Sequence, residues 1–264
     1  MKTIKKIYSI LLISVILFSC STEVKRYPFD DTISKNQLVY LENDMSLVNG
    51  IVYVKNLDNT INQEITYIDG KKEGLESSWY ENGQIKEGGN YINGKKDGVW
   101  KTYHENSQLI FEGNYINGKE DGLIKSWYEN GHLFSEMNYI DGKKDGLQKI
   151  WRENGSIWME VKFINDLMEG ESKEWYENGQ LTFEGDYING KRDGEHKNWD
   201  ENGDLDYTNN FKDGKLEGIN KNYIDGKLSS TVEYKNDKMD GLFKFYYNGR
   251  LLSTSVYKND KRID

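Results

Sequence analysis

Residues 91–98 read Tyr-Ile-Asn-Gly-Lys-Lys-Asp-Gly, and closely similar stretches return along the chain at a fixed interval. The aromatic residue that opens each stretch recurs every 24 residues and, at the end, every 23 residues. Its positions are Tyr67, Tyr91, Tyr115, Tyr139, Phe163, Tyr187, Phe211, Tyr234 and Tyr257. A period of this length is typical of repeat proteins, in which each unit is one supersecondary motif that packs on its neighbours.

Each unit carries two turn signals with a strand-length segment between them. The first is Asn-Gly, as at Asn93-Gly94, and the second is Glu-Asn-Gly, as at residues 129–131. Such turns between short strands are typical of β-hairpins. The sequence therefore predicts an all-β fold, an elongated single-layer antiparallel sheet of tandem 24-residue β-hairpins. We expect roughly sixteen to eighteen strands, spaced about 4.8 Å apart.

The length of the Glu-Asn-Gly loop can be argued from the faces of the sheet. A two-residue loop at Asn82-Gly83 would pair Trp79 with Lys86 and divide the apolar residues between the two faces. A three-residue loop, with Gly83 in the left-handed conformation, pairs Trp79 with Ile85 instead. We predict the three-residue loop. Ser107 replaces the glycine of one such loop, at a strain of about 1 kcal/mol.

Continued without interruption, this register predicts further pairs across the hairpins. They are Ser77 with Glu87, Leu75 with Gly89, Leu123 with Met137, Trp127 with Leu133, Trp151 with Ile157, and Trp175 with Leu181. The Trp, Leu and Phe side chains would then share one face with Gly89, Gly113 and Gly185. A glycine there leaves room for a neighbouring ring to lie on the backbone.

The N-terminus has the pattern of a lipoprotein signal peptide. Residues 1–19 join a lysine-containing start to a short apolar run, and Leu17-Phe18-Ser19-Cys20 resembles the lipobox of bacterial lipoproteins. The resemblance implies cleavage before Cys20 and lipidation of that cysteine, which would anchor the protein to a membrane. The alternative is an ordinary signal peptide with a coincidental cysteine. We expect a tether over residues 20–37 and the repeat array over residues 38–264.

Composition excludes several classes of ligand. The formal net charge is −9, which argues against nucleic acid as a partner. One Cys and three His exclude an internal disulfide and a Cys-rich zinc site. The chain contains no Gly-rich phosphate loop and no Gly-x-Ser-x-Gly motif, and its acids repeat identically on turns instead of forming one distinct pair. We therefore predict that the protein is not an enzyme and has no cofactor.

The repeat unit resembles a known family. The pattern Gly-x-x-x-x-Trp-Tyr-Glu-Asn-Gly-x-Leu, followed by Glu-Gly-x-Tyr-Ile-Asn-Gly-Lys-x-Asp-Gly, is similar to the bacterial variant of the MORN repeat found in YwqK-like antitoxin-type proteins. The resemblance spans about residues 50–264. It implies an interaction module, since arrays of this type generally act as protein-binding or assembly scaffolds and have also been linked to lipids.

One column of aromatic residues is the candidate partner-binding face. It consists of Trp79, Tyr103, Trp127, Trp151, Trp175 and Trp199. These rings could bind a partner or could instead be the core of the array. The adjacent column varies in chemistry, which fits either partner selection or a free solvent face. Its members are Tyr80, His104, Tyr128, Arg152, Tyr176 and Asp200.

Two rows of acids follow the turns, one at residues 81, 105, 129, 153, 177 and 201, and the other at residues 97, 121, 145 and 193. Calcium needs several converging oxygens, whereas one acid per hairpin gives a row. We therefore predict no metal site.

Three functional hypotheses remain. The first is a lipid-anchored scaffold of the cell envelope that binds an unidentified protein, at the outer membrane or cell surface if the source is Gram-negative. The second is an immunity or antitoxin-like protein that neutralises an envelope-acting toxin. The third is a cell-wall or polysaccharide-binding module, for which a glycan is the ligand.

Overall fold

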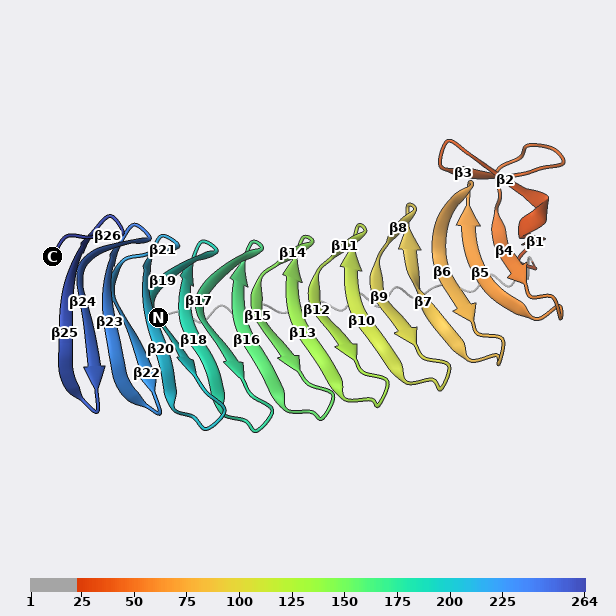
Figure 1. Cartoon of the computed structure of the whole chain (residues 1–264). Helices are drawn as coiled ribbons and strands as arrows, with labels where there is room; N and C mark the ends of the chain where they lie inside the picture. The colour runs from red at the N-terminus through yellow and green to blue at the C-terminus, as the bar shows by residue number, and fades with distance from the viewer. Residues whose placement is uncertain (1–22) are drawn as a thin grey trace, which may run out of the picture.

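Each hairpin lies beside the next in chain order, so the molecule is a long, single-layer, curved sheet (Figure 1). The computed structural model describes residues 23–264, and the predicted signal peptide and Cys20 lie outside this range. The main sheet has 24 strands, and a separate two-stranded sheet lies near its N-terminal end. The predicted fold class is confirmed. Among the described residues, no helix is long and apolar enough to cross a membrane.

The bounds of the elements are as follows. The N-terminal part contains β1 (Arg26–Pro28), the 3-10 helix η1 (Phe29–Asp31), β2 (Thr32–Lys35), β3 (Leu38–Leu41), β4 (Gly50–Lys55) and β5 (Ile61–Ile68). The central part contains β6 (Lys71–Trp79), β7 (Ile85–Ile92), β8 (Lys95–Lys96), β9 (Gly98–Tyr103), β10 (Leu109–Ile116), β11 (Lys119–Glu120), β12 (Gly122–Trp127), β13 (Leu133–Ile140), β14 (Lys143–Lys144), β15 (Gly146–Trp151) and β16 (Ile157–Ile164). The C-terminal part contains β17 (Leu167–Trp175), β18 (Leu181–Ile188), β19 (Lys191–Trp199), β20 (Leu205–Lys212), β21 (Lys215–Leu216), β22 (Gly218–Ile224), β23 (Lys227–Lys235), β24 (Lys238–Tyr247), β25 (Arg250–Lys258) and β26 (Lys261–Arg262).

The strand count exceeds the expected sixteen to eighteen because several strands are interrupted. Asp97 separates β8 from β9, and its backbone N–H donates to the Asn90 carbonyl at 2.9 Å. Gly98 follows with a φ of +83°, a conformation that glycine adopts without strain. The same interruption separates β11 from β12 and β14 from β15. One physical strand is therefore divided into two short segments.

The two turns of each repeat have the conformations that their sequences favour. At Asn93-Gly94 both residues are left-handed, with φ values of +52° and +76°, as a two-residue hairpin turn requires. At the other edge, Gly83 has a φ of +80° and donates its N–H to the Tyr80 carbonyl at 2.9 Å. The predicted three-residue loop is confirmed. Ser107 is left-handed, with a φ of +66°, also as predicted.

The predicted register is correct at the loop and wrong beyond it. Trp79 pairs with Ile85 as expected, and so do Trp127 with Leu133, Trp151 with Ile157, and Trp175 with Leu181. A bulge then shifts the pairing by one residue, because Lys86 has no partner on β6. The predicted pairs Ser77–Glu87, Leu75–Gly89 and Leu123–Met137 are replaced by Ser78–Glu87, Glu76–Gly89 and Ile124–Met137.

This shift corrects the assignment of faces. We call the face that carries the buried side chains of Glu76, Trp100, Met137, Val161 and His196 the inner face, and the opposite face the outer face. Because side chains alternate along β6, Trp79 shares the outer face with Leu75 and lies opposite to Glu76. Gly89, Gly113 and Gly185 are thus on the other face from the Trp column.

A ring does lie on the backbone at two of these glycines, as the sequence suggested, but it comes from the inner face. A Cβ at Gly89 would be 2.3 Å from the Trp100 ring, and one at Gly185 would be 2.5 Å from the His196 ring. At Gly113 the space is filled by Ile124 and Phe111. Glycine is therefore required here by close packing, and these positions have no positive φ.

The N-terminal end of the sheet is covered by its own cap. β1 pairs in parallel with β4, and β2 and β3 form a hairpin whose Val39 N–H donates to the Gly70 carbonyl at 2.8 Å. Beneath it, Val48, Val52 and Tyr67 form a small core cluster. Part of the segment expected to be a tether, residues 20–37, is therefore structured from Arg26 onward. Pro28 is tolerated because β1 is an edge strand.

Candidate functional site

The predicted partner-binding column lies near the Glu-Asn-Gly turns and is half-buried. One long strand of each repeat ends in a residue of this column: Trp79, Tyr103, Trp127, Trp151, Trp175 or Trp199. Each pairs with an aliphatic residue of the following strand, namely Ile85, Leu109, Leu133, Ile157, Leu181 or Leu205. Rings and aliphatic side chains therefore alternate along this edge. The column is a partly exposed apolar band.

The variable column next to it joins one repeat to the next. The Tyr80, Tyr128 and Tyr176 hydroxyls donate to the backbone carbonyls of Tyr103, Trp151 and Trp199, at 2.7, 2.9 and 2.9 Å. Arg152 donates from its guanidinium to the Trp175 carbonyl at 2.5 Å. What this column requires is a long side chain with a terminal donor, which both Tyr and Arg supply. Four of the six residues of this column meet this requirement, namely Tyr80, Tyr128, Arg152 and Tyr176.

The acids and amides of the turns make a second set of links. Asn82, Asn130 and Asn178 donate to the carbonyls of Glu105, Glu153 and Glu201 in the next loop, at 3.0, 2.8 and 2.9 Å. At the other edge, the carboxylates of Asp97, Asp121, Asp145 and Asp193 accept hydrogen bonds from backbone N–H groups of the following turn. The second acid row is therefore structural. No group of three potential metal ligands occurs in residues 23–264.

A ladder of alternating charges follows the middle of the outer face. Its members pair in order across the strands: Lys101, Glu112, Lys125, Glu136, Lys149, Glu160, Lys173, Glu184 and Lys197. The Lys125 and Lys149 ammonium groups lie 2.8 Å from the carboxylates of Glu136 and Glu160. Opposite charges directly across a strand pair stabilise a sheet, whereas like charges there would destabilise it.

An exposed aliphatic stripe, which was not predicted from the sequence, lies on the outer face beside this ladder. One of its columns is Leu75, Val99, Leu123 and Leu147, which are 67, 52, 47 and 47% exposed. A second column contains Ile68, Ile92, Ile116, Ile140 and Ile164, also exposed. The detectable signal was the isoleucine that follows the aromatic residue in most units, since strand alternation turns it to the opposite face.

The inner face carries the aromatic residues that define the period, with cationic groups above several of them. The Lys96 ammonium lies 3.9 Å from the centre of the Trp100 ring and 5.4 Å from that of Tyr115. Lys144 covers Phe163 at 5.0 Å, and Arg192 covers Phe211 at 5.2 Å. Burial raises the pKa of Tyr91 well above its ordinary value, and the nearby Glu76 carboxylate adds to this effect.

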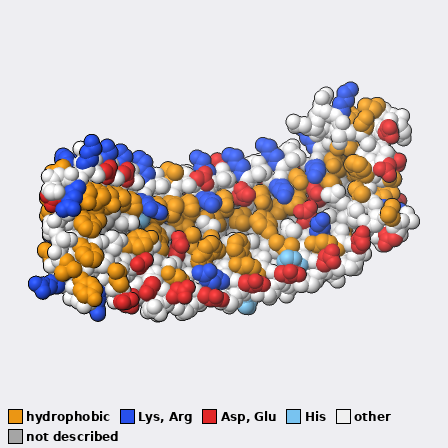
Figure 2. Space-filling model, viewed as in Figure 1, with side chains coloured by type: hydrophobic (Ala, Val, Ile, Leu, Met, Phe, Trp, Pro, Cys, Tyr) orange, Lys and Arg blue, Asp and Glu red, His pale blue; other side chains and the backbone are white. Residues whose placement is uncertain are grey.

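The charge of the turns differs between the two long edges. The Asn-Gly turns are followed by exposed lysines, such as Lys71, Lys95 and Lys119, whereas the opposite turns carry exposed glutamates, such as Glu81 and Glu105. Figure 2 shows a band of hydrophobic side chains along the molecule between these basic and acidic edges. The surface is thus divided into long parallel strips, which suits an extended partner more than a compact small molecule.

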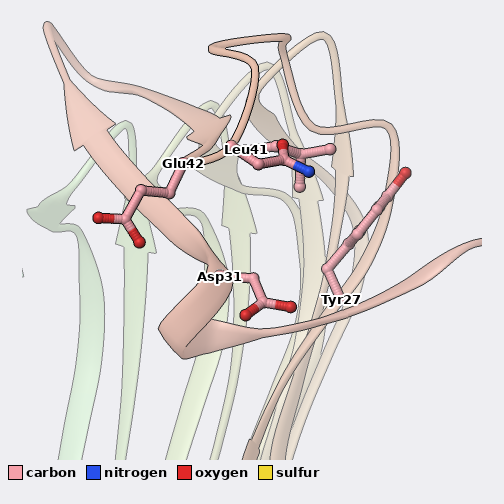
Figure 3. Close-up of a pocket in the computed structure, with 5 residues that line it drawn as sticks. Tyr27, Asp31, Leu41 and Glu42 are labelled. Carbon is pink, nitrogen blue, oxygen red and sulfur yellow. The ribbon is translucent and has the colours of Figure 1, made fainter.

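One cavity lies in the N-terminal cap. It has a volume of about 470 Å³ and is lined by Tyr27, Asp31, Leu41, Glu42 and Asn43. In Figure 3 the carboxyl group of Glu42 points away from Asp31 and Tyr27. The two acids therefore do not converge on a common ligand.

The match to a protein-family model agrees with the repeat architecture. The family model described as MORN repeat variant matches residues 72–93, 96–117, 120–141, 144–165, 168–189 and 192–213. No curated protein matches the chain. Two solved structures that show similarity are described as Crystal Structure of TcdB2-TccC3 and Crystal Structure of TcdB2-TccC3-TEV. Their sequence identities are 11% and 12%, and both TM-scores are 0.21. The alignments cover 79% and 82% of this chain but only 15% and 14% of theirs.

Proposed function

Because this chain belongs to the MORN repeat variant family, we propose that it is a non-catalytic scaffold that binds a protein partner along the outer face of its sheet. The observation that carries the proposal is the aliphatic stripe formed by Leu75, Val99, Leu123 and Leu147 together with the isoleucine column. The first column places one exposed aliphatic side chain in each repeat, with Asn90, Asn114 and Asn138 on the strands between, and exposed apolar surface rimmed by polar residues is typical of interaction sites.

The chemistry of the stripe supports one kind of partner. An exposed lysine pairs directly with an isoleucine of the stripe in several repeats, as in Ile92 with Lys95 and Ile116 with Lys119. A partner that fits would offer apolar side chains flanked by acidic ones at the repeat spacing of about 10 Å, which is twice the distance between neighbouring strands. The half-buried Trp column is the other apolar band of this face and would extend the contact.

The test uses substitutions that the array already contains. Glu171 and Glu195 occupy the column of Leu123 and Leu147 in the next two repeats, so a glutamate there is compatible with the fold. We would compare photo-crosslinking of the wild-type chain and of the Leu123→Glu/Leu147→Glu variant to partners in envelope extract. A specific crosslinked protein that is lost in the folded variant supports the proposal. A crosslinked protein that the variant retains contradicts it.

We also propose that the protein is attached to a membrane of the cell envelope through a lipid on Cys20. The charged start, the short apolar run and the small residue before Cys20 support this proposal. Metabolic labelling with an alkyne fatty acid should label the wild-type chain, and Cys20→Ser should abolish the label and release the protein from the membrane fraction. A wild-type chain that carries no label would contradict the anchor.

A further inference from the structure

A cavity of about 260 Å³ opens on the inner face between β17 and β20. His196 lies at its floor, is only 2% exposed, and is held by the Asp186 carbonyl 2.8 Å from its Nε2. Phe183, Tyr187 and Phe211 surround the His196 ring in edge-to-face geometry, with ring centroids 5.5, 5.4 and 4.9 Å away. The His196 ring is therefore held among three aromatic rings at the floor of the cavity.

One wall of the cavity alternates polar and aromatic side chains across four neighbouring strands. Glu174 pairs with Phe183, Phe183 with Asn198, and Asn198 with Tyr207. The two rings thus lie on alternate strands, about 10 Å apart, with an amide between them. In the two preceding repeats the same row carries Ser126, Ser135, Ile150 and Met159 instead.

The polar groups of this wall are not used by the fold. Within residues 23–264 the Glu174 carboxylate and the amides of Asn198 and Asn209 take part in no hydrogen bond or ion pair. By contrast, Asn222, in the same row one repeat later, donates to Ser230 at 2.9 Å. Glu174 is partly buried without a partner. Desolvation therefore disfavours its charged form and raises the pKa of its carboxyl group. Donors and acceptors that the fold leaves free beside aromatic rings fit a ligand with both an apolar face and a polar rim.

The charges at the cavity select among such ligands. An organic cation would be attracted by the rings and by Glu174, but it would meet the guanidinium of Arg192, which lies over Phe211. A free anion would meet the Glu174 carboxylate. A pyranose sugar avoids both conflicts, because its C–H face stacks on a ring while its hydroxyl groups donate to a carboxylate and exchange hydrogen bonds with amides.

We propose that this cavity is a saccharide-binding site, in which a pyranose ring stacks on Phe183 or Tyr207 and bonds through its hydroxyls to Asn198 and Glu174. The site is on the face opposite to the aliphatic stripe. It is therefore a second binding function that does not depend on the proposed protein partner.

Saturation-transfer NMR with the full chain tests the proposal. The probes are cellobiose and chitobiose, which separate plain from N-acetylated neutral sugars, together with tetramethylammonium as a cation. At least one disaccharide should receive saturation. Asn198→Ala and Glu174→Gln should each weaken its affinity about five- to tenfold, the effect of one hydrogen bond. Thr102→Ala, in the same row of an earlier repeat, is the matched control and should bind as the wild type does.

Three results would overturn the proposal. They are no saturation of any disaccharide, saturation of tetramethylammonium alone, and equal binding by the wild type and both cavity variants. Thermal unfolding of each variant, followed by circular dichroism, ensures that a lost signal reports on the site. The Leu123→Glu/Leu147→Glu variant should bind the sugar normally, so failure of the protein-binding proposal and failure of this one can be told apart.

Discussion

The Tyr128 hydroxyl donates a hydrogen bond to the backbone carbonyl of Trp151, 2.9 Å away in the next repeat. Tyr→Phe changes in this column should weaken the link between repeats without changing their packing. We expect Tyr128→Phe to lower the free energy of unfolding by about 1 kcal/mol, the net contribution of one hydrogen bond. Chemical denaturation measures this loss. Tyr247→Phe, at an exposed tyrosine, is the control and should have no measurable effect.

Gly89→Ala should be strongly destabilising although its backbone is not left-handed. The added Cβ would lie 2.3 Å from the Trp100 ring, so the ring or the strand has to move. Overpacking of this kind costs about 1 to 3 kcal/mol. A second change, Trp100→Leu, should recover part of the loss in the Gly89→Ala background. If Gly89→Ala unfolds at the same denaturant concentration as the wild type, the ring does not rest on this glycine.

Ser107→Gly should stabilise the array. Ser107 adopts a φ of +66°, which is strained for a residue with a side chain. Glycine removes a cost of about 1 kcal/mol but also removes the Ser107 hydroxyl that donates to Gln84. We therefore expect a modest net gain in unfolding free energy. Ser107→Ala separates the two effects, since it loses the hydroxyl and keeps the strain, and it should be less stable than the wild type.

The charge ladder predicts a salt-dependent loss of stability. Lys149 lies between Glu136 and Glu160 on the neighbouring strands. Lys149→Glu places three carboxylates side by side and should destabilise the protein by about 1 kcal/mol at low ionic strength. The loss should shrink in concentrated salt because the charges are partly exposed. The double variant Lys149→Glu/Glu160→Lys should recover part of it. An effect that salt leaves unchanged would point to lost packing.

The buried His196 predicts a dependence on pH. Burial lowers the pKa of His196 below its ordinary value of 6.5, so the folded protein binds a proton less readily than the unfolded chain. Its contribution to stability is complete above the unfolded-state pKa and is lost as the pH falls from there through the folded-state pKa. His196→Gln should therefore flatten the decline in unfolding free energy between neutral and mildly acidic pH. Parallel pH profiles would contradict this assignment.

The period and the turn residues were sufficient to predict the fold. Asn-Gly and Glu-Asn-Gly determine which residues are left-handed, so the loop at Gly83 and the pair Trp79–Ile85 followed from the sequence. The bulge at Lys86 did not, because a bulge residue needs no particular side chain. This single unpaired residue changed the face on which Gly89 lies.

The candidate sites were harder to predict for the same reason. The alternation that turns Leu75 outward and Glu76 inward depends on the register after the bulge. The cavity at His196 arises from strands of three successive repeats, and its alternation of Glu174, Phe183 and Asn198 appears only once those strands are aligned. The cap of β1 to β3 was missed because its sequence does not follow the repeat.

Hydrogen bonds join each repeat to the next at equivalent positions, as between the Tyr128 hydroxyl and the Trp151 carbonyl or between the backbone N–H of Asn117 and Asp97. If residues 129–152 were removed from the middle of the array, the Tyr128 hydroxyl would meet the Trp175 carbonyl, which is equivalent to that of Trp151 and accepts from Arg152 in the intact chain. Unequal recombination can therefore shorten or lengthen this protein by whole hairpins while the fold survives. Its length is open to selection, and with it the reach of the molecule and the number of contact strips that it presents.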